Sequence, residues 1–323
     1  MRGSRLTVAV LLLVAIAIPA VASSARPVSA RAPVPGTSCQ VLPADNVWNL
    51  DISRLPVHHK SRIWKKAMHA GSTNLHPDFG PPHYGIPFDV VDDGHATTGV
   101  HFTYASESDA GPYPFGSDTT IEGGSDAHAI MVNRDTCTLY ELFAAQWNGG
   151  NPRAGSGAVF DLGSNALRPK GWTSADAAGL PIFPGLIRWD EVQAGYIGHA
   201  IRFTADCTSR DYLWPARHQA GAVDRRCPPM GARFRLKRGF ALKGASRDAK
   251  VIVNAMKHYG LILADNGSDW YFQGEVNGHW TNGLMDQLKR IPASAFVAVD
   301  ESGCRVKPNS GVAVPGSRCP VPR

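Results

Sequence analysis

The chain has 323 residues, with 33 Lys and Arg against 27 Asp and Glu and a formal net charge of +6. This charge is mild and evenly spread along the sequence, which excludes the basic footprint of a typical nucleic-acid-binding protein. The 33 Gly and 24 Pro residues divide the sequence into short runs, and this favours a loop-rich β protein over a helical one.

Residues 1–22 predict a secretory signal peptide. A basic start, MRGSR, is followed by the apolar run LTVAVLLLVAIAIPAVA, in which the small residues Ala20 and Ala22 form a cleavage site. An uncleaved membrane anchor is the alternative interpretation. No later run reaches the roughly 18 apolar residues that a membrane span needs. We therefore expect a secreted, extracellular monomer that has no contact with a membrane after cleavage.

All the cysteines follow the predicted signal peptide. An even number of cysteines in an exported chain predicts disulfide bonds. Two pairs that are close in sequence would close short loops, which leaves the third pair to form a longer one. The absence of a C-x-x-C spacing argues against a zinc ribbon. The expected pairs are Cys207 with Cys227, Cys304 with Cys319, and Cys39 with Cys137.

The rest of the chain divides into a flexible leader at 23–37, a single domain at 38–301 and a disulfide-stapled tail at 302–323. A short helix is expected at 61–71. A longer helix is expected from Ser246 as the N-cap residue to a stop at Gly260, and a β-hairpin follows it in LILADNGSDWYFQG. Strands are expected at 88–93, 99–105, 128–134, 138–144, 157–163, 198–205 and 233–237.

Many short strands separated by Gly and Pro turns are typical of an antiparallel β-sandwich. We therefore predict a mainly β protein, a sandwich of jelly-roll type with one or two short helices. The basic run RFRLKRGFALKG at 233–244 alternates apolar and charged residues, so we interpret it as a strand with one solvated face.

The segment DAHAIMVNRDTCTLYELF, residues 126–143, reads as two strands joined by a turn. If Asn133 faces Thr138 across the turn, the two-residue period of a strand places His128 and Glu141 on one face as diagonal neighbours. A histidine beside a carboxylate can form an acid–base pair or a metal-ligand pair. It can equally form a hydrogen-bonded structural pair.

A second strand, YIGHAIRFTA, carries His199 and Arg202 on opposite faces. If this strand joins the same sheet, His128 and His199 share one cleft with Glu141. Upstream, Asp190 and Glu191 suit the first turn of a short helix, because acidic side chains complement the helix dipole there.

The loop SESDAGPYPFGSDTTIEGGSDAH precedes the first of these strands and is rich in acidic residues. Glycoside hydrolysis needs two carboxyl groups, and Glu122 or Asp126 can pair with Glu141. A lyase would use His128 or His199 as the base, Tyr104 or Tyr140 as the proton donor, and Arg202 or Arg217 against a uronate. We expect no cofactor and assign no metal-ligating residue, although Ca²⁺ in this loop and a transition metal on His and Glu are alternatives.

Several aromatic residues lie beside Gly, Asn, Asp or Thr, in segments expected to be loops or strand ends. Exposed aromatic rings can stack on sugar rings, while neighbouring polar side chains bind hydroxyl groups; buried tryptophans fill the core instead. His218 is expected on a loop at the rim of the cleft. The predicted substrate-binding residues are Trp147, Trp172, Trp214, Trp270, Arg202 and His218.

Three phrases, DAHAIMVNRDTCTLYELF, GLIRWDEVQAGYIGHAIRF and AMKHYGLILADNGSDWYF, resemble signature phrases of a group of secreted bacterial proteins of unknown function. The resemblance covers about residues 44–300 and implies one exported domain. It implies no activity.

These observations predict a secreted enzyme that acts on a polysaccharide or oligosaccharide, either a glycoside hydrolase or a lyase. Glu141 is the expected acid or nucleophile, with His128, His199, Glu122 and Asp126 as the other catalytic candidates. The alternative is an extracellular glycan-binding or cell-envelope protein without catalysis. A secreted structural protein, in which the histidines only satisfy neighbouring groups, is a third interpretation.

Overall fold

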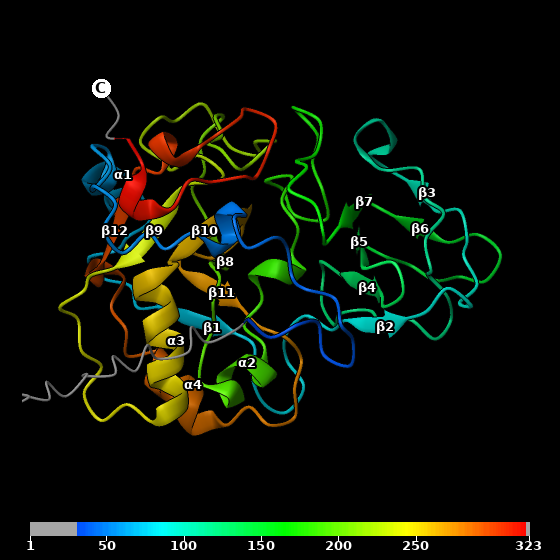
Figure 1. Cartoon of the computed structure of the whole chain (residues 1–323), viewed down its shortest axis with the longest axis horizontal. Helices are drawn as coiled ribbons and strands as arrows, with labels where there is room; N and C mark the ends of the chain where they lie inside the picture. Colours follow the sequence, from blue (N-terminus) through cyan, green and yellow to red (C-terminus); the bar gives the residue numbers. More distant parts are fainter. Residues whose placement is uncertain (1–30, 321–323) are drawn as a thin grey trace, which may run out of the picture. The chain divides into compact units, whose positions relative to one another are not determined.

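The computed structural model describes residues 31–320, and its largest sheet has six strands in the order β1-β11-β8-β10-β9-β12 (Figure 1). The pairs β1·β11 and β8·β10 are parallel, and the other three pairs are antiparallel. The strands are β1 (His76–Asp78), β8 (Ile201–Ala205), β9 (Arg233–Leu236), β10 (Leu261–Asn266), β11 (Tyr271–Gln273) and β12 (Phe296–Val299).

A four-stranded sheet has the order β2-β4-β5-β7, and β3 and β6 form a separate parallel pair. Asn133 pairs with Thr138 and Ile130 with Glu141, so the register predicted for the β4–β5 hairpin is confirmed. The strands are β2 (Asp89–Val91), β3 (His101–Phe102), β4 (Ala129–Asn133), β5 (Thr138–Phe143), β6 (Arg153–Ala154) and β7 (Ser156–Asp161).

The predicted predominance of β structure is confirmed, but the predicted all-antiparallel arrangement is wrong. A jelly roll is built from antiparallel strands, whereas here parallel and antiparallel pairs share the larger two sheets. The expected hairpin of β10 and β11 is also wrong, because β8 lies between these two strands. The Asn-Gly turn at Asn266 therefore leads the chain across β8 instead of back along β10.

In the described part of the chain, four α-helices accompany the sheets, more than the one or two expected. Helix α3 has Ser246 as its N-cap, whose side chain accepts a hydrogen bond from the Ala249 N–H, and Gly260 follows its end with a positive φ of 72°. Both features were predicted. The helices are α1 (Ser61–Ala67), α2 (Trp189–Ala194), α3 (Arg247–His258) and α4 (Asn282–Leu288); 3₁₀ turns are η1 (Val47–Asn49), η2 (Ala105–Glu107), η3 (Phe183–Gly185), η4 (Ala293–Ala295), η5 (Ser302–Cys304) and η6 (Gly316–Arg318).

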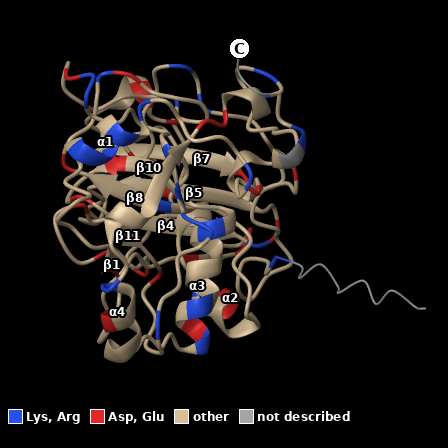
Figure 2. Cartoon of the chain, turned by 90° about the vertical axis from the view of Figure 1, so that its left-hand side faces the viewer, with Lys and Arg blue, Asp and Glu red and all other residues tan. Residues whose placement is uncertain are grey.

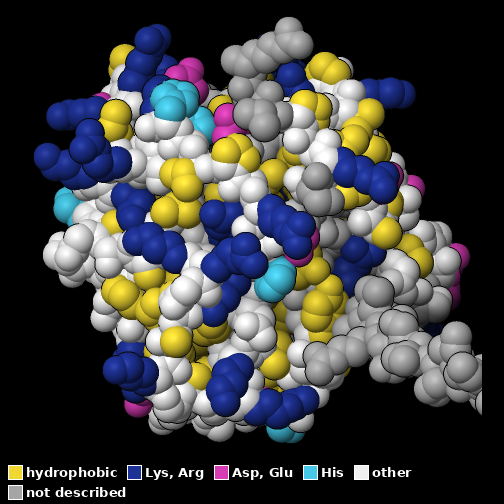
Figure 3. Space-filling view, turned by 60° about the vertical axis from the view of Figure 1, so that its left-hand side comes forward, with side chains coloured by type: hydrophobic (Ala, Val, Ile, Leu, Met, Phe, Trp, Pro, Cys, Tyr) yellow, Lys and Arg dark blue, Asp and Glu magenta, His cyan; other side chains and the backbone are white. Residues whose placement is uncertain are grey.

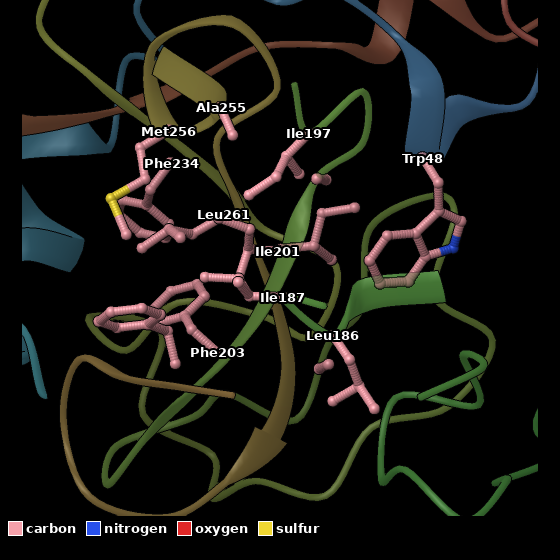
Figure 4. Packing of buried hydrophobic residues seen from close by; sticks show 14 of the residues in the cluster. Trp48, Leu186, Ile187, Ile197, Ile201, Phe203, Phe234, Ala255, Met256 and Leu261 are labelled. Carbon is pink, nitrogen blue, oxygen red and sulfur yellow. The ribbon is translucent and has the colours of Figure 1, made fainter. Parts of the chain in front are cut away.

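The four-stranded sheet is covered on both faces. Ile130 and Val132 of β4 belong to the main core, in which strands of the six-stranded sheet and α3 also pack, as Figure 4 shows for Phe203, Leu261 and Met256. The alternate residues of β4 belong to a second, smaller core. Because residues two apart share a face of a strand, the face that carries His128 and Glu141 is directed into the main core.

The three predicted disulfides are confirmed. Cys39 pairs with Cys137, Cys207 with Cys227, and Cys304 with Cys319. Disulfides are typical of an oxidising, extracellular environment. Within residues 31–320, no helix has the length and apolar character needed to cross a membrane. The predicted signal peptide and part of the predicted leader lie outside the described residues.

Candidate functional site

A cavity of about 370 Å³ lies beside the end of β10 and the edge of the four-stranded sheet. This volume is within the range of ligand sites, roughly 300–1,000 Å³. Its lining brings together residues that are far apart in the sequence. The acidic, histidine and aromatic lining residues are Tyr104, Glu107, Asp126, Phe143, His218 and Asp265.

The end of β10 is a favourable place for a binding site. Strands β8 and β10 are parallel, so their carboxyl ends lie at the same edge of the sheet, where ligands bind in many sheets with parallel strands. The register between the two strands shifts between Leu263 and Asp265. Irregularities of this kind change the direction of side chains near sites. Here the residue after the shift, Asp265, lines the cavity.

Asp265 competes with a second carboxylate for one cation. Arg202 binds Asp176 through both Nε and Nη2, with Nε 3.0 Å from Oδ2 of Asp176. The Arg202 Nη2 atom is 3.7 Å from Oδ2 of Asp265, which leaves Asp265 as the weaker partner. Burial and then the charge of Asp176 raise the pKa of Asp265 to about 8, although Arg202 opposes this rise.

The raised pKa favours the protonated form of Asp265 near neutral pH. Its side chain is still 21% exposed, so the carboxyl group can reach a ligand in the cavity. A protonated carboxyl group that a ligand can contact is a proton donor.

A histidine and a second carboxylate lie elsewhere in the same cavity. Nδ1 of His218 donates a hydrogen bond to the Ala177 carbonyl at 2.8 Å, which leaves Nε2 available for another partner. Nε2 lies 3.7 Å from Oε2 of Glu107, and this carboxylate accepts a hydrogen bond from the Thr173 N–H. Asp126 is exposed at the same cavity. His218 and Asp126, both predicted as site residues, are thus brought together with Asp265.

The buried His128 pairs with the partly buried Glu122 beside the cavity. Nδ1 of His128 is 2.5 Å from Oε2 of Glu122, while Nε2 is buried without a hydrogen-bond partner among the described residues. Burial alone would lower the pKa of His128. The hydrogen bond to Glu122 and the negative charge of Glu122 outweigh burial, so the pKa of His128 is raised. The His128 ring lies 6.0 Å from that of Phe143, which lines the cavity. His128 is therefore behind the cavity wall.

Glu141 shares a strand face with His128, as predicted, but it is fully buried and does not line the cavity. Its carboxylate accepts hydrogen bonds from the backbone N–H groups of Ile182 and Phe183, at 2.9 and 2.8 Å, and so caps the turn η3. Burial raises the pKa of Glu141 to about 7, although the two hydrogen bonds lower it. The expected role of Glu141 as acid or nucleophile is corrected on this ground, because no ligand can reach it.

His199 belongs to a different buried cluster, so the expected cleft shared with His128 is wrong. Nε2 of His199 is 3.0 Å from Oε2 of Glu191, and Oε1 of Glu191 is 3.0 Å from Nη2 of Arg188. Nδ1 of His199 donates to the Ala200 carbonyl at 2.7 Å. Burial alone would raise the pKa of Glu191. The charges of Arg188 and His199 outweigh burial, so the pKa of Glu191 is lowered. This cluster joins α2 to the start of β8.

None of the four predicted tryptophans lines the cavity. Trp270 is completely buried in the main core and donates through Nε1 to the Met68 carbonyl. Trp214 donates to the Ser310 carbonyl, Trp172 lies beneath the Arg168 guanidinium, and Trp147 packs in the second core. Arg202, also predicted to bind substrate, is buried on Asp176. The aromatic side chains at the cavity are instead Tyr104 and Phe143.

Asp265 and Asp176 were not among the predicted site residues. Asp265 ends the apolar run LILAD, and an acidic residue at the carboxyl end of a buried strand is the signal that was available. Asp176 lies between small residues in a loop and gives no such signal. In residues 31–320, no three His, Cys, Asp or Glu side chains gather as the ligands of a metal ion would.

Comparison of the chain with protein-family models, with curated proteins and with solved structures finds no match. The resemblance to secreted bacterial proteins stays a prediction.

Proposed function

We propose that the protein is a secreted glycoside hydrolase whose acid is Asp265. The observation that carries the proposal is the cavity in which Asp265, with its pKa raised to about 8, lies together with Glu107, Asp126 and His218. Two carboxyl groups with different protonation states are what glycoside hydrolysis needs.

In this mechanism the Asp265 O–H donates its proton to the glycosidic oxygen as the bond from that oxygen to the anomeric carbon breaks. Water adds to the anomeric carbon and gives a proton to Glu107, which His218 faces at 3.7 Å. Glu107 then releases its proton to solvent and Asp265 takes one from solvent, which restores both carboxyl groups. Phe143 and Tyr104 offer aromatic surfaces against which a sugar ring can pack.

The lining of the cavity favours hydrolysis over elimination. A lyase that acts on uronates needs a cation against the sugar carboxylate, and no Lys or Arg among residues 31–320 lines this cavity. The two arginines considered for that role are occupied: Arg202 binds Asp176, and Arg217 binds the carbonyls of Arg168 and Pro308. The buried His128 and His199 cannot act as bases toward a polymer.

The test is turnover of a panel of neutral and acidic glycans, measured as new reducing ends. Asp265→Asn cannot donate a proton, so we expect turnover to fall by about 10²- to 10⁴-fold, with the fold intact. The matched control is Asp286→Asn, which removes an exposed carboxylate on α4 and should leave turnover unchanged. Because the acid is active when protonated, turnover of the wild-type protein should decline as the pH rises through about 8.

Three results would contradict the proposal. Full activity of Asp265→Asn would remove Asp265 from the mechanism. Ultraviolet absorbance of an unsaturated uronate would identify a lyase. Retention on a glycan without any product would identify a glycan-binding protein.

A further inference from the structure

Basic side chains gather on the face formed by α1, the end of β9 and α3. Figure 3 shows many Lys and Arg side chains and few acidic ones on this side of the molecule, and Figure 2 shows the Lys and Arg positions on α1 and α3. The even spread of charge in the sequence concealed this, because the residues come from separate segments. We call this surface the basic face and define it by Arg54, Lys65, Lys237, Arg238 and Lys257.

Two of these cations are held together without an acid. The Nζ atoms of Lys65 and Lys237 both donate to the Ser294 carbonyl oxygen, at 2.9 and 3.1 Å. Neither lysine forms an ion pair with another residue in the described part of the chain. Burial and then the charge of Lys237 lower the pKa of Lys65, which shows the repulsion between them. A bound anion would relieve it.

A groove of about 960 Å³ lies among the other three cations, Arg54, Arg238 and Lys257. None of the three forms an ion pair within residues 31–320. Two acids also line the groove, and neither is paired with one of these cations: Asp51 is 3.0 Å from Nδ1 of His258, and Oδ1 of Asp45 accepts a hydrogen bond from Nδ2 of Asn165 at 2.8 Å. The groove is therefore lined by cations that lack acidic partners.

One wall of the groove is fixed by an arginine of β9. Nη1 of Arg235 donates to the backbone carbonyls of Ile52, Ser53 and Leu55, at 2.8 to 3.1 Å. These bonds hold the segment that carries Arg54 in place. A fixed segment loses less conformational entropy when it binds a ligand, so the groove is prepared for binding.

We propose that the basic face binds an acidic polysaccharide through its carboxylate groups. An extended polyanion can neutralise Lys65, Lys237 and the cations of the groove together. Nucleic acid is less suited, because single strands bind to exposed aromatic rings. The large apolar side chains exposed on or beside α1 are Val57 and Ile63, neither of which is aromatic. The three disulfides favour an oxidising compartment, where acidic polysaccharides are available.

This binding does not depend on the proposed hydrolysis at Asp265. The face would hold the protein on an acidic matrix while the cavity, which lacks Lys and Arg, acts on neutral sugars.

The experiment measures the Kd of the purified protein for fluorescently labelled polygalacturonate at low salt. Lys65→Gln/Lys237→Gln removes two charges but keeps two hydrogen-bond donors, and we expect it to raise Kd roughly tenfold. The matched control, Lys170→Gln/Lys307→Gln, removes the same charge from exposed positions outside the basic face and should change Kd less than twofold. Arg238→Gln/Lys257→Gln should weaken binding as well, and it tests the groove separately.

Amylose, a neutral polymer, should not bind. Equal losses for the first pair and the control pair would show only a net-charge effect and overturn the proposal, as would no binding of polygalacturonate. Tighter binding of single-stranded DNA would assign a nucleic acid instead. Asp265→Asn should bind polygalacturonate as the wild-type protein does, so a failure of the proposed hydrolysis is distinguishable from a failure of the basic face.

Discussion

Ionisable side chains in buried clusters and those at the cavity differ in how completely they are paired. In two separate buried clusters, Glu141 has two backbone donors and His199 has an acceptor at each ring nitrogen. In the cavity, Asp265 is left as the weaker partner of Arg202 and stays open to a ligand. Residue type does not separate the groups, since both contain histidines and carboxylates. Incomplete pairing together with access marks the candidate site.

The largest effect is expected where pairing is most complete. Asp176→Asn leaves Arg202 buried without its anionic partner and should lower the free energy of unfolding by about 3–5 kcal/mol. The freed Arg202 would also stabilise ionised Asp265, so turnover should fall too. Urea denaturation and the glycan assay measure the two effects. Asp224→Asn, in an exposed pair with Arg226, is the control and should not change the unfolding midpoint. If Asp176→Asn and Asp224→Asn were equally stable, the distinction between buried, completely paired side chains and exposed ones would be contradicted.

A smaller effect, which depends on pH, is expected at Glu141. Its pKa is raised from 4.5 to about 7, so the folded protein holds this proton more tightly than the unfolded chain. The stability contribution is full below pH 4.5 and is lost as the pH rises to 7, by on the order of a few kcal/mol. Glu141→Gln does not ionise. In chemical denaturation, the difference in free energy of unfolding between the wild-type protein and Glu141→Gln should therefore shrink between pH 5 and pH 8. A difference that widened instead would show that ionised Glu141 does not destabilise the folded protein.

The smallest effect concerns the aromatic lining. Phe143→Leu removes a ring from the cavity wall and should raise KM a few-fold while kcat changes little, because packing against a sugar contributes on the order of 1 kcal/mol. Trp147→Phe changes an aromatic residue of the second core, away from the cavity, and should leave both constants unchanged. A larger effect from Trp147 than from Phe143 would place the substrate elsewhere.

Local features of the fold could be predicted from the sequence. The spacing of the cysteines predicted the three disulfides, and the N-cap Ser246 with Gly260 predicted the limits of α3. The alternation of residues in the β4–β5 hairpin predicted its register, including Ile130 opposite Glu141. These features depend on residues that are near each other or on simple counting.

The neighbours of each strand and the exposure of each face could not be predicted. Nothing in LILADNGSDWYFQG shows that β8 comes between its two strands. Alternation placed His128 and Glu141 on one face correctly, but this face is covered by the main core and the opposite face by the second. A period of two shows that two sides differ, and it does not show which side meets water.

The parallel pairing of β8 with β10 has a consequence for folding. Arg202 and Asp265 are neighbours only after the chain has formed β9 and α3 between them, and Glu107 joins them from a still more distant segment. Contacts between residues so far apart in sequence form slowly, since loop closure costs entropy before the contacts stabilise it. During refolding, the local helices and the β4–β5 turn would be complete well before the cavity exists, so recovery of activity reports the last stage of assembly.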